Sequence, residues 1–184
     1  LTENGVKALV LDMDNTLSIS DAESLFAFAA TVAGGDDFQG KIVVLTDDID
    51  LSGQTWTPID DFYGTFDGAG HTISNLTVEG NENYAGLFGD CRKGTESGGG
   101  MHHLTIRNLT LSNAKISGNE SVAAVVAASS NVTIENVTVQ NSVINGQKYV
   151  GGILGYSYGN GTPSIAECKA IGVTLSIGET GGAI

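Results

Sequence analysis

The chain has 184 residues and a formal net charge of −13 at pH 7, from 8 Lys and Arg against 21 Asp and Glu. A chain of this charge repels phosphate backbones and anionic lipids, so neither nucleic acid nor a membrane surface is an expected partner. Gly is abundant at 26 residues and Pro is scarce at 2, which favours many short strands joined by tight turns. No apolar run approaches the roughly 18 residues that a transmembrane helix needs.

The first candidate motif is Asp12-x-Asp14-x-Thr16, which follows an apolar run. It resembles the first motif of haloacid dehalogenase-type phosphatases, in which the first Asp is the nucleophile, the second is the general acid, and Mg²⁺ offsets the phosphate charge. Such an enzyme also needs a Lys on a third element and a parallel αβ sheet, and the chain shows no βα alternation after Gly64. We therefore expect Asp12 and Asp14 to face solvent, and the phosphatase ranks third among the functions considered.

A helix is predicted over about residues 21–33. Ser20 and Glu23 have the spacing of a capping box, with Ser20 as the N-cap, and Gly34-Gly35 ends the helix. One face of the helix is apolar and consists of Leu25, Phe26, Ala29 and Val32. If the strands that follow this helix form a stack, the open end of that stack exposes unpaired strand edges. We therefore predict that the helix is an N-terminal cap that covers this end.

Three aspartates follow the next predicted strand, which spans residues 41–45. Asp47, Asp48 and Asp50 could ligate Ca²⁺ through their carboxylate oxygens, but they lack the spacing of an EF-hand, and a solvated acidic turn is the favoured interpretation. Cys91 and Cys168 are too few for a four-cysteine metal site, and both are expected to be reduced. No cofactor is expected.

Two short sequence blocks recur at intervals of about 30 residues, a period typical of solenoid proteins. The first block begins with Ile and carries Asn or Glu two residues later, and its copies are 73–78, 106–111, 134–139 and 165–170. The second block has small residues at its second and third positions, and its copies are 84–89, 122–127, 150–155 and 180–184. β-branched residues in two-residue alternation indicate strands rather than helices.

Stacked repeats of this kind predict an all-β parallel β-helix, a β-solenoid with about three strands per coil, in which the coils share one core. The predicted core columns are Leu76, Leu109, Val137 and Cys168, and Val78, Leu111, Val139 and Ala170. Asn75, Asn108 and Asn136 are predicted to stack as an amide ladder, which Glu167 would end. We predict one continuous domain, with a cap over residues 1–63 and repeats over 64–184 that are truncated at the C-terminal end, as a fragment of a longer protein.

Six segments, in this order, resemble the GLUG-motif β-helix proteins of bacterial surfaces, which also occur in the N-terminal regions of immunoglobulin A-cleaving metalloproteases. They are Ser20–Ala29, Leu45–Gly53, Trp56–Ile59, Gly64–Ile73, Ala85–Gly89 and Gly152–Gly155. The resemblance covers about residues 17–184. It implies a right-handed parallel β-helix, a secreted or anchored parent protein, and a stalk or adhesive role, and it carries over no catalytic residue.

The expected function is that of a non-catalytic, adhesin-like scaffold or binding module, extracellular at a bacterial cell surface, in contact with a host or dietary glycan or protein. The chain is expected to be monomeric within a longer surface protein. Binding of this kind needs exposed aromatic side chains, and the candidates are Trp56, Tyr63, Tyr156 and Tyr158, the last two on one face. The alternative is a polysaccharide lyase or hydrolase, which would need convergent carboxylates, or Ca²⁺ with Arg or Lys, in a groove.

Overall fold

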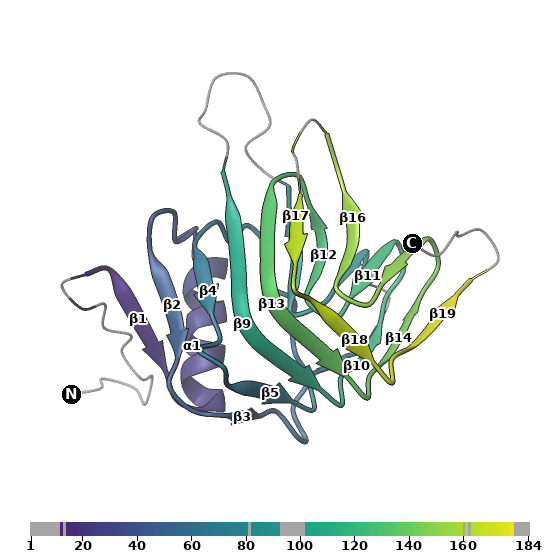
Figure 1. The fold of residues 1–184 in the computed structure, drawn as a ribbon, viewed down its shortest axis with the longest axis horizontal. Coiled ribbons are helices and arrows are strands. Elements are labelled where there is room, and N and C mark those ends of the chain that lie inside the picture. The colour runs from purple at the N-terminus through teal and green to yellow at the C-terminus, as the bar shows by residue number, and fades with distance from the viewer. Residues whose placement is uncertain are drawn as a thin grey trace.

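The computed structural model describes residues 12, 14–80, 82–92, 102–159, 161 and 163–178. It is an all-β structure with one helix, α1 (Ala22–Ala33), at the N-terminal end of a stack of strands (Figure 1). Every strand pair among the described residues is parallel, as the repeats predicted. In this part of the chain, no helix is long and apolar enough to cross a membrane.

The largest sheet has nine strands and runs from the N-terminal end of the stack to its C-terminal end. Its main path is β1-β2-β4-β9-β13-β17; β3 pairs with β5, β5 also pairs with β9, and β18 pairs with β13. The strands are β1 (Thr16–Ile19), β2 (Ile42–Leu45), β3 (Ile49–Asp50), β4 (Thr65–Asp67), β5 (Thr72–Ser74), β9 (Leu104–Ser112), β13 (Val132–Gln140), β17 (Ser164–Ala166) and β18 (Lys169–Ile171).

Three smaller sheets complete the stack, and each contains one strand from each successive pass of the chain. The first consists of β6 (Thr77–Val78), β10 (Lys115–Ser117), β14 (Val143–Gly146) and β19 (Thr174–Ile177). The second consists of β7 (Tyr84–Ala85), β11 (Ser121–Ala123) and β15 (Tyr149–Gly151). The third consists of β8 (Phe88–Cys91), β12 (Val126–Ser129) and β16 (Leu154–Ser157).

One pass of the chain through the four sheets makes a coil, and the coil from β9 to β12 has four strands rather than the predicted three or so. The difference arises because the second sequence block divides between two sheets. In each described copy, two residues separate the two strands, and a small residue comes first: Gly86-Leu87, Ala124-Val125 and Gly152-Ile153. A small side chain at this point leaves room for the sharp bend.

The coils bend at residues with a left-handed backbone conformation, which Asn tolerates better than other non-glycine residues. Asn108 and Asn136 lie at one corner, with φ of 53° and 52°. A second corner, a few residues further along each coil, is formed by equivalent residues with positive φ, namely Asn75, Asn113, Asn141 and Gly172. Two corners with the same preference for Asn therefore occur in every complete coil.

This arrangement corrects the predicted alignment of the first repeat. Ile73 lies opposite Leu111, not opposite Ile106, which lies opposite Ile134. The block 73–78 is therefore equivalent to 111–116, the second corner, and Leu76 does not share a column with Leu109. Both corners have Asn followed by apolar alternation, so the local sequence pattern does not distinguish one corner from the other.

The core is continuous along the stack, and its columns become aromatic towards the N-terminal end. Ile106 and Ile134, like Leu111 and Val139, are fully buried neighbours from adjacent coils. Phe28, Phe62, Phe66 and Phe88 form a cluster whose neighbouring ring centroids are 5.2 to 6.0 Å apart. Burial of each such ring stabilises the fold by about 2–3 kcal/mol.

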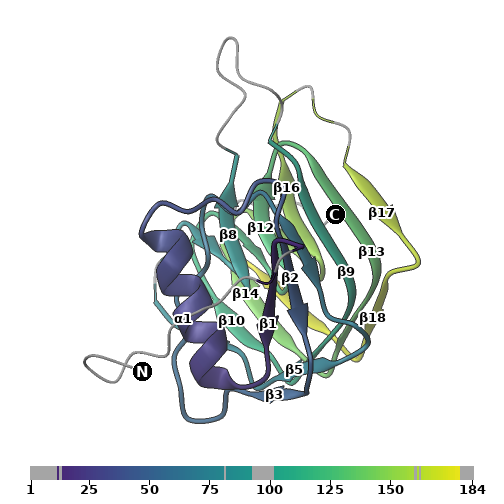
Figure 2. The same ribbon diagram turned by 90° about the vertical axis from the view of Figure 1, so that its left-hand side faces the viewer.

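Helix α1 covers the N-terminal end of the stack beside β1 and β2 (Figure 2). Its N-cap is Asp21 rather than Ser20: the Asp21 carboxylate accepts a hydrogen bond from the Ser24 N–H at 2.8 Å, and the Ser24 hydroxyl accepts one from the Asp21 N–H. An Asp can cap as well as a Ser, so the sequence allowed both positions. The most buried apolar side chains of the helix are Leu25, Phe28 and Val32. Phe28 was absent from the predicted face.

Candidate binding groove

An open groove of about 1330 Å³ lies between α1 and the strand β8. Its α1 wall is apolar and consists of Phe26, Ala29, Ala30, Val32 and Ala33. The opposite wall is the segment 57–61 together with the end of β8, and it carries the carboxylates of Asp60, Asp61 and Asp90. Tyr63, Asp37, Arg92, His102 and Tyr158 also line the groove.

Buried anchors hold the acidic wall in place. The Trp56 indole N–H donates a 3.0 Å hydrogen bond to the Leu87 carbonyl, and Ile59 forms a parallel bridge with Phe88. The Asp61 N–H donates to the Asp90 carbonyl at 3.0 Å, so the segment 57–61 runs along β8 as an extra edge strand. The aspartates at its end are therefore fixed by backbone pairing.

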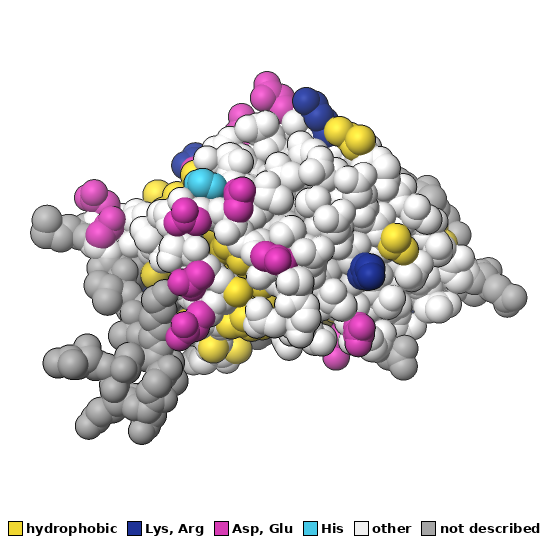
Figure 3. All heavy atoms as spheres, turned by 90° about the horizontal axis from the view of Figure 1, so that it is seen from below, with side chains coloured by type: hydrophobic (Ala, Val, Ile, Leu, Met, Phe, Trp, Pro, Cys, Tyr) yellow, Lys and Arg dark blue, Asp and Glu magenta, His cyan; other side chains and the backbone are white. Residues whose placement is uncertain are grey.

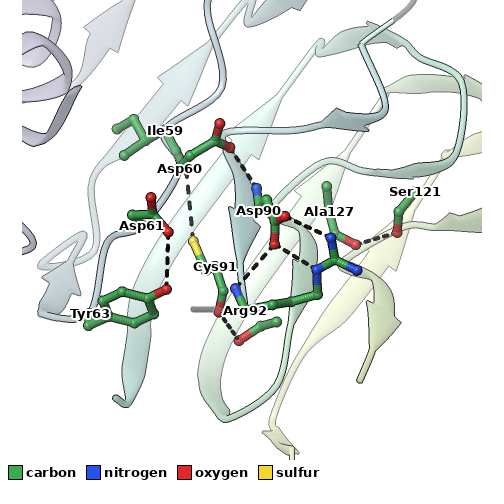
Figure 4. Close-up of polar contacts among 10 residues, drawn as sticks. Ile59, Asp60, Asp61, Tyr63, Asp90, Cys91, Arg92, Ser121 and Ala127 are labelled. Carbon is green, nitrogen blue, oxygen red and sulfur yellow. Dashed lines mark hydrogen bonds and ion pairs between the residues drawn. The ribbon is translucent and has the colours of Figure 1, made fainter. Parts of the chain in front are cut away.

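Gly89 lets this segment lie close to β8. A Cβ at position 89 would collide with the Asp60 carboxylate and lie 3.0 Å from Pro58 Cβ. The absence of a side chain at Gly89 thus brings Asp60 over the strand, where its carboxylate accepts a 2.7 Å hydrogen bond from the Asp90 N–H (Figure 4).

The carboxylates repel one another. Loss of contact with water raises the pKa of Asp60, and the nearby carboxylates of Asp90, Asp61 and Glu82 raise it further, although the hydrogen bond from the Asp90 N–H opposes them. The Tyr63 hydroxyl lies 3.3 Å from the Asp61 carboxylate, and burial, together with this charge, raises the Tyr63 pKa.

Arg92 neutralises one of these carboxylates. Its guanidinium forms two 2.7 Å hydrogen bonds to the two oxygens of Asp90, a bidentate ion pair that raises the Arg92 pKa (Figure 4). The guanidinium carbon also lies 4.4 Å from the Tyr84 ring centroid and 5.9 Å from that of Tyr158. Arg92 is thereby held at the rim of the groove, between the acidic wall and two tyrosines.

A row of tyrosines continues from the groove onto β16 and β15. The ring centroids of Tyr158 and Tyr156 are 6.2 Å apart, and those of Tyr156 and Tyr149 are 4.5 Å apart with nearly parallel planes. Tyr158 is 51% exposed and Tyr149 is 38% exposed. Tyr156 and Tyr158 thus lie close together, as their alternation predicted, while Tyr149 was not among the predicted ligand residues.

Two of the four predicted ligand aromatics are buried. Trp56 is only 2% exposed and Tyr63 only 5%, so neither presents an open ring face to a ligand. Trp56 packs against Phe26 with centroids 5.1 Å apart, and Tyr63 lies 4.6 Å from the His102 ring. The sequence could not reveal this, because the segment that carries both residues is buried by α1 and β8, which are distant in the chain.

The structure places His102 at the groove. Its Nδ1 atom is buried without a hydrogen-bond partner, and it lies 3.8 Å from the Asp37 carboxylate. Cys91, directly behind the acidic wall, is free and fully buried, and burial raises its thiol pKa. The Cys91 thiol therefore remains protonated and is a core group rather than a nucleophile.

The predicted asparagine ladder forms only in part. Asn136 Nδ2 donates to Asn108 Oδ1 at 3.0 Å, and Asn108 Nδ2 donates to the Asp67 carboxylate at 3.1 Å. Asn75 lies at the other corner and donates to the Asp50 carboxylate at 2.7 Å. Hydrogen bonds between neighbouring coils therefore run in two columns, and aspartates take part in both.

Two of the three candidate calcium ligands, Asp48 and Asp50, accept hydrogen bonds from other parts of the chain. The Asp48 carboxylate accepts from the Thr72 N–H, and that of Asp50 accepts from Asn75 and from the Ser52 N–H. Asp47 is exposed, and the described residues contain no group of three His, Cys, Asp or Glu side chains placed to hold a metal ion. Acidic side chains gather on the N-terminal half of the face in Figure 3, which is largely uncharged elsewhere.

The phosphatase-like motif forms a turn before β1. The Asp12 carboxylate accepts hydrogen bonds from the N–H groups of Asp14 and Thr16, both at 2.9 Å. Asp12 and Asp14 are exposed, and β1 leads into the parallel stack rather than into an αβ sheet. The apolar residues before Asp12, and the last copy of the second block (180–184), lie outside the described residues.

No protein-family model matches the chain. A segment of 70 residues, 38% of the chain, is 46% identical to Halomucin of Haloquadratum walsbyi, and it spans about 1% of that protein's length. A crystal structure of a Bacteroides ovatus protein, provisionally identified as an immunoglobulin A1 protease, shares 14% identity and a TM-score of 0.36 over 90% of this chain and 84% of that one.

Proposed function

We propose that the chain is a segment of right-handed parallel β-helix from an extracellular surface protein, and that it acts as a non-catalytic, adhesin-like binding module. The observation that carries this proposal is a stack of parallel coils bearing an open groove and a row of partly exposed tyrosines. Right-handed crossover is the hand that nearly all parallel connections adopt. The stack serves as the support, and the groove and tyrosines are the contact surface.

The extracellular setting is supported by a segment of 70 residues that is 46% identical to Halomucin, whose name is that of a mucin, an extracellular class of protein. The extracellular location is tested by labelling intact cells of the source organism with an antibody against this chain. Labelling that disappears after brief protease treatment of the cells supports surface exposure. Labelling only after the cells are permeabilised contradicts it.

The binding role is tested by screening the purified chain against a glycan array and a panel of immobilised extracellular proteins. Tyr158→Ala and Tyr149→Ala remove the two most exposed rings of the row and should weaken binding to any true ligand about tenfold each. Thr138→Ala, on the large sheet, is the matched control. Equal binding by the wild type and both tyrosine variants would contradict a contact surface at this row.

A polysaccharide hydrolase is the second candidate, because one observation favours it. The raised pKa of Asp60, close to two other carboxylates, is the pattern of a carboxyl group that acts as a general acid. Two contacts argue against a hydrolase. The Asp60 carboxylate already accepts a hydrogen bond from the Asp90 N–H, and the Asp90 carboxylate is paired with the Arg92 guanidinium. Reducing-end release from a panel of polysaccharides tests the enzyme: activity that Asp60→Asn abolishes would replace the binding module as the function.

A further inference from the structure

The tyrosine row, which consists of Tyr149, Tyr156 and Tyr158, is carried by β15, by β16 and by the residue that follows β16. Parallel pairing places Tyr149 beside Ser121 and Tyr156 beside Ala128 of the neighbouring coil, and both of these small residues are buried. The Tyr158 N–H donates a 3.0 Å hydrogen bond to the carbonyl of residue 129. Pairing with the neighbouring coil therefore fixes the backbone positions from which all three rings project.

Two ion pairs flank this row. At one end, Arg92 holds Asp90 in the bidentate pair described above. At the other end, Lys148, which precedes Tyr149, lies 3.2 Å from the carboxylate of Glu120 on the neighbouring coil. Each pair cancels its own charge, so the flanks of the row carry no net charge, although the chain as a whole has a charge of −13. Such a surface favours a ligand without charge, and the acidity of the whole chain disfavours an anionic one.

The exposed area of the row is too small to hold a protein partner by itself. A tyrosine offers about 150–250 Å² in all, so Tyr149 at 38% exposure and Tyr158 at 51% present roughly 150–200 Å² together. A stable protein interface needs about 800 Å² on each partner. The other large apolar side chains that are exposed among the described residues lie on β14, β17, β18 and β19, in different sheets, and do not extend the row.

The pyranose ring of a sugar has the chemistry that this surface can hold. The faces of the sugar ring carry C–H groups with a slight positive charge, which attract the negative face of an aromatic ring. The edge of the sugar ring carries hydroxyl groups, each of which can donate and accept a hydrogen bond. Arg92 supplies donors and Asp90 supplies acceptors side by side, and their side chains are 27% and 31% exposed. A purely aliphatic ligand would leave this polar flank unused.

We propose that the tyrosine row binds a neutral glycan, with one pyranose ring stacked on Tyr158, the next over the Tyr149–Tyr156 pair, and sugar hydroxyl groups on Arg92 and Asp90. The inference rests on the proposed binding function and names the class of ligand and the surface that holds it. Stacking supplies the affinity, and the ion pair at the end of the row orients the sugar.

Isothermal titration calorimetry tests the inference with four neutral hexasaccharides, namely cellohexaose, xylohexaose, mannohexaose and chitohexaose. Hexagalacturonate is the anionic probe of the same length. We expect at least one neutral hexasaccharide to bind, and hexagalacturonate to bind at least about tenfold more weakly than that sugar. Because the ligand is uncharged, its affinity should change by less than about twofold between about 50 and 500 mM NaCl.

Three substitutions at Tyr158 separate ring stacking from simple apolar contact. Tyr158→Phe keeps the aromatic face and should change the affinity for the neutral hexasaccharide by less than about threefold. Tyr158→Leu keeps an apolar side chain without that face, and it should weaken binding about tenfold, as Tyr158→Ala does. Since Tyr158 is half exposed, the melting temperature of all three variants should stay within about 2 °C of the wild type. Thr138→Ala, on the large sheet, is again the matched control.

Full affinity in Tyr158→Leu would overturn the stacked sugar, and so would tighter binding of hexagalacturonate than of every neutral hexasaccharide. Tyrosine-dependent binding of an immobilised protein, with no binding of the four neutral hexasaccharides, would overturn the glycan and leave the binding module standing. A wild type that binds neither the hexasaccharides nor any member of the glycan and protein panels would overturn both.

Discussion

Single residues with unusual backbone or packing requirements determine how the coils are joined and where the groove forms. Asn108 and Asn136 turn the corner in a left-handed conformation and link neighbouring coils through their amides. Gly89 provides the space in which Asp60 lies against β8. At this scale, one side chain decides whether a segment of backbone can occupy its place.

Gly89→Ala is expected to destabilise the fold by about 1–3 kcal/mol, because the added Cβ displaces Asp60 and the segment that carries it. Gly152→Ala is the matched control, since a Cβ at that position would meet only the Ala170 methyl group, at 3.4 Å. Urea unfolding followed by circular dichroism measures both variants. A larger loss for Gly152→Ala than for Gly89→Ala would refute the close approach at Gly89.

Asp60 and Asp67 should respond to pH in opposite directions. The raised pKa of Asp60 favours folding below the unfolded value of about 3.9, and this contribution is lost as the pH rises through the folded pKa. Burial alone would raise the pKa of Asp67, but hydrogen bonds from the Ala69 N–H, Asn108 and Arg107 lower it. Its contribution is therefore present above about 3.9 and is lost as the pH falls through the folded pKa.

From these signs, Asp67→Asn should lower the free energy of unfolding at pH 7 by about 1–2 kcal/mol. Asp60→Asn should instead leave it unchanged or raise it by less than about 1 kcal/mol, because it removes a charge from a repelling group. Both differences should shrink at pH 3.5. Urea titrations at the two pH values measure them, and a loss at pH 7 that is as large for Asp60→Asn as for Asp67→Asn would count against this assignment.

At the scale of elements, α1 closes the N-terminal end of the stack and also forms the apolar wall of the groove. One side of it buries Leu25, Phe28 and Val32, and a neighbouring surface presents its alanines to the groove. Loss of this helix would thus expose the aromatic core and remove the apolar wall of the groove. Its N-cap therefore affects both the stability of the stack and the shape of the groove.

Asp21→Ala should destabilise the protein by about 1 kcal/mol, because it removes the acceptor for the Ser24 N–H. Ser20→Ala should have almost no effect, since the Ser20 hydroxyl only donates a long, exposed hydrogen bond to Asp21. Thermal unfolding of the two variants compares the two candidate caps directly. Should Ser20→Ala prove the more damaging substitution, the N-cap would be Ser20 as the capping-box pattern suggested.

For the whole molecule, the core is a set of columns whose burial depends on how many coils surround each position. Ile106, Ile134 and Ile165 occupy one column, and their exposures are 0%, 0% and 49%. The same side chain at equivalent positions therefore contributes very differently to stability. Stability in a stacked fold is a property of neighbouring coils rather than of a residue type.

Ile134→Ala is expected to destabilise the protein by about 2–4 kcal/mol, since it leaves a cavity between two coils. Ile165→Ala should lower stability by less than about half of that amount, because half of its surface is already exposed. Equilibrium unfolding in urea measures both, with the slope of the transition as a check on two-state behaviour. Equal losses would show that Ile165 is buried as fully as Ile134, which would contradict the difference in exposure.

The sequence by itself determined the parallel, all-β arrangement with one N-terminal helix, because apolar alternation and a repeat of about 30 residues depend on local spacing. It also placed the contact of Asn108 with Asn136 and the proximity of Tyr156 to Tyr158, which follow from repeat position and alternation. Only the tertiary structure decided that Asn75 belongs to a different corner, that a coil has four strands, and that Trp56 and Tyr63 are buried. It also brought Asp60 beside Asp90 and His102 beside Asp37 to form the groove. These outcomes depend on register and on packing between segments distant in the chain, where the free energy comes from contacts that no local pattern specifies.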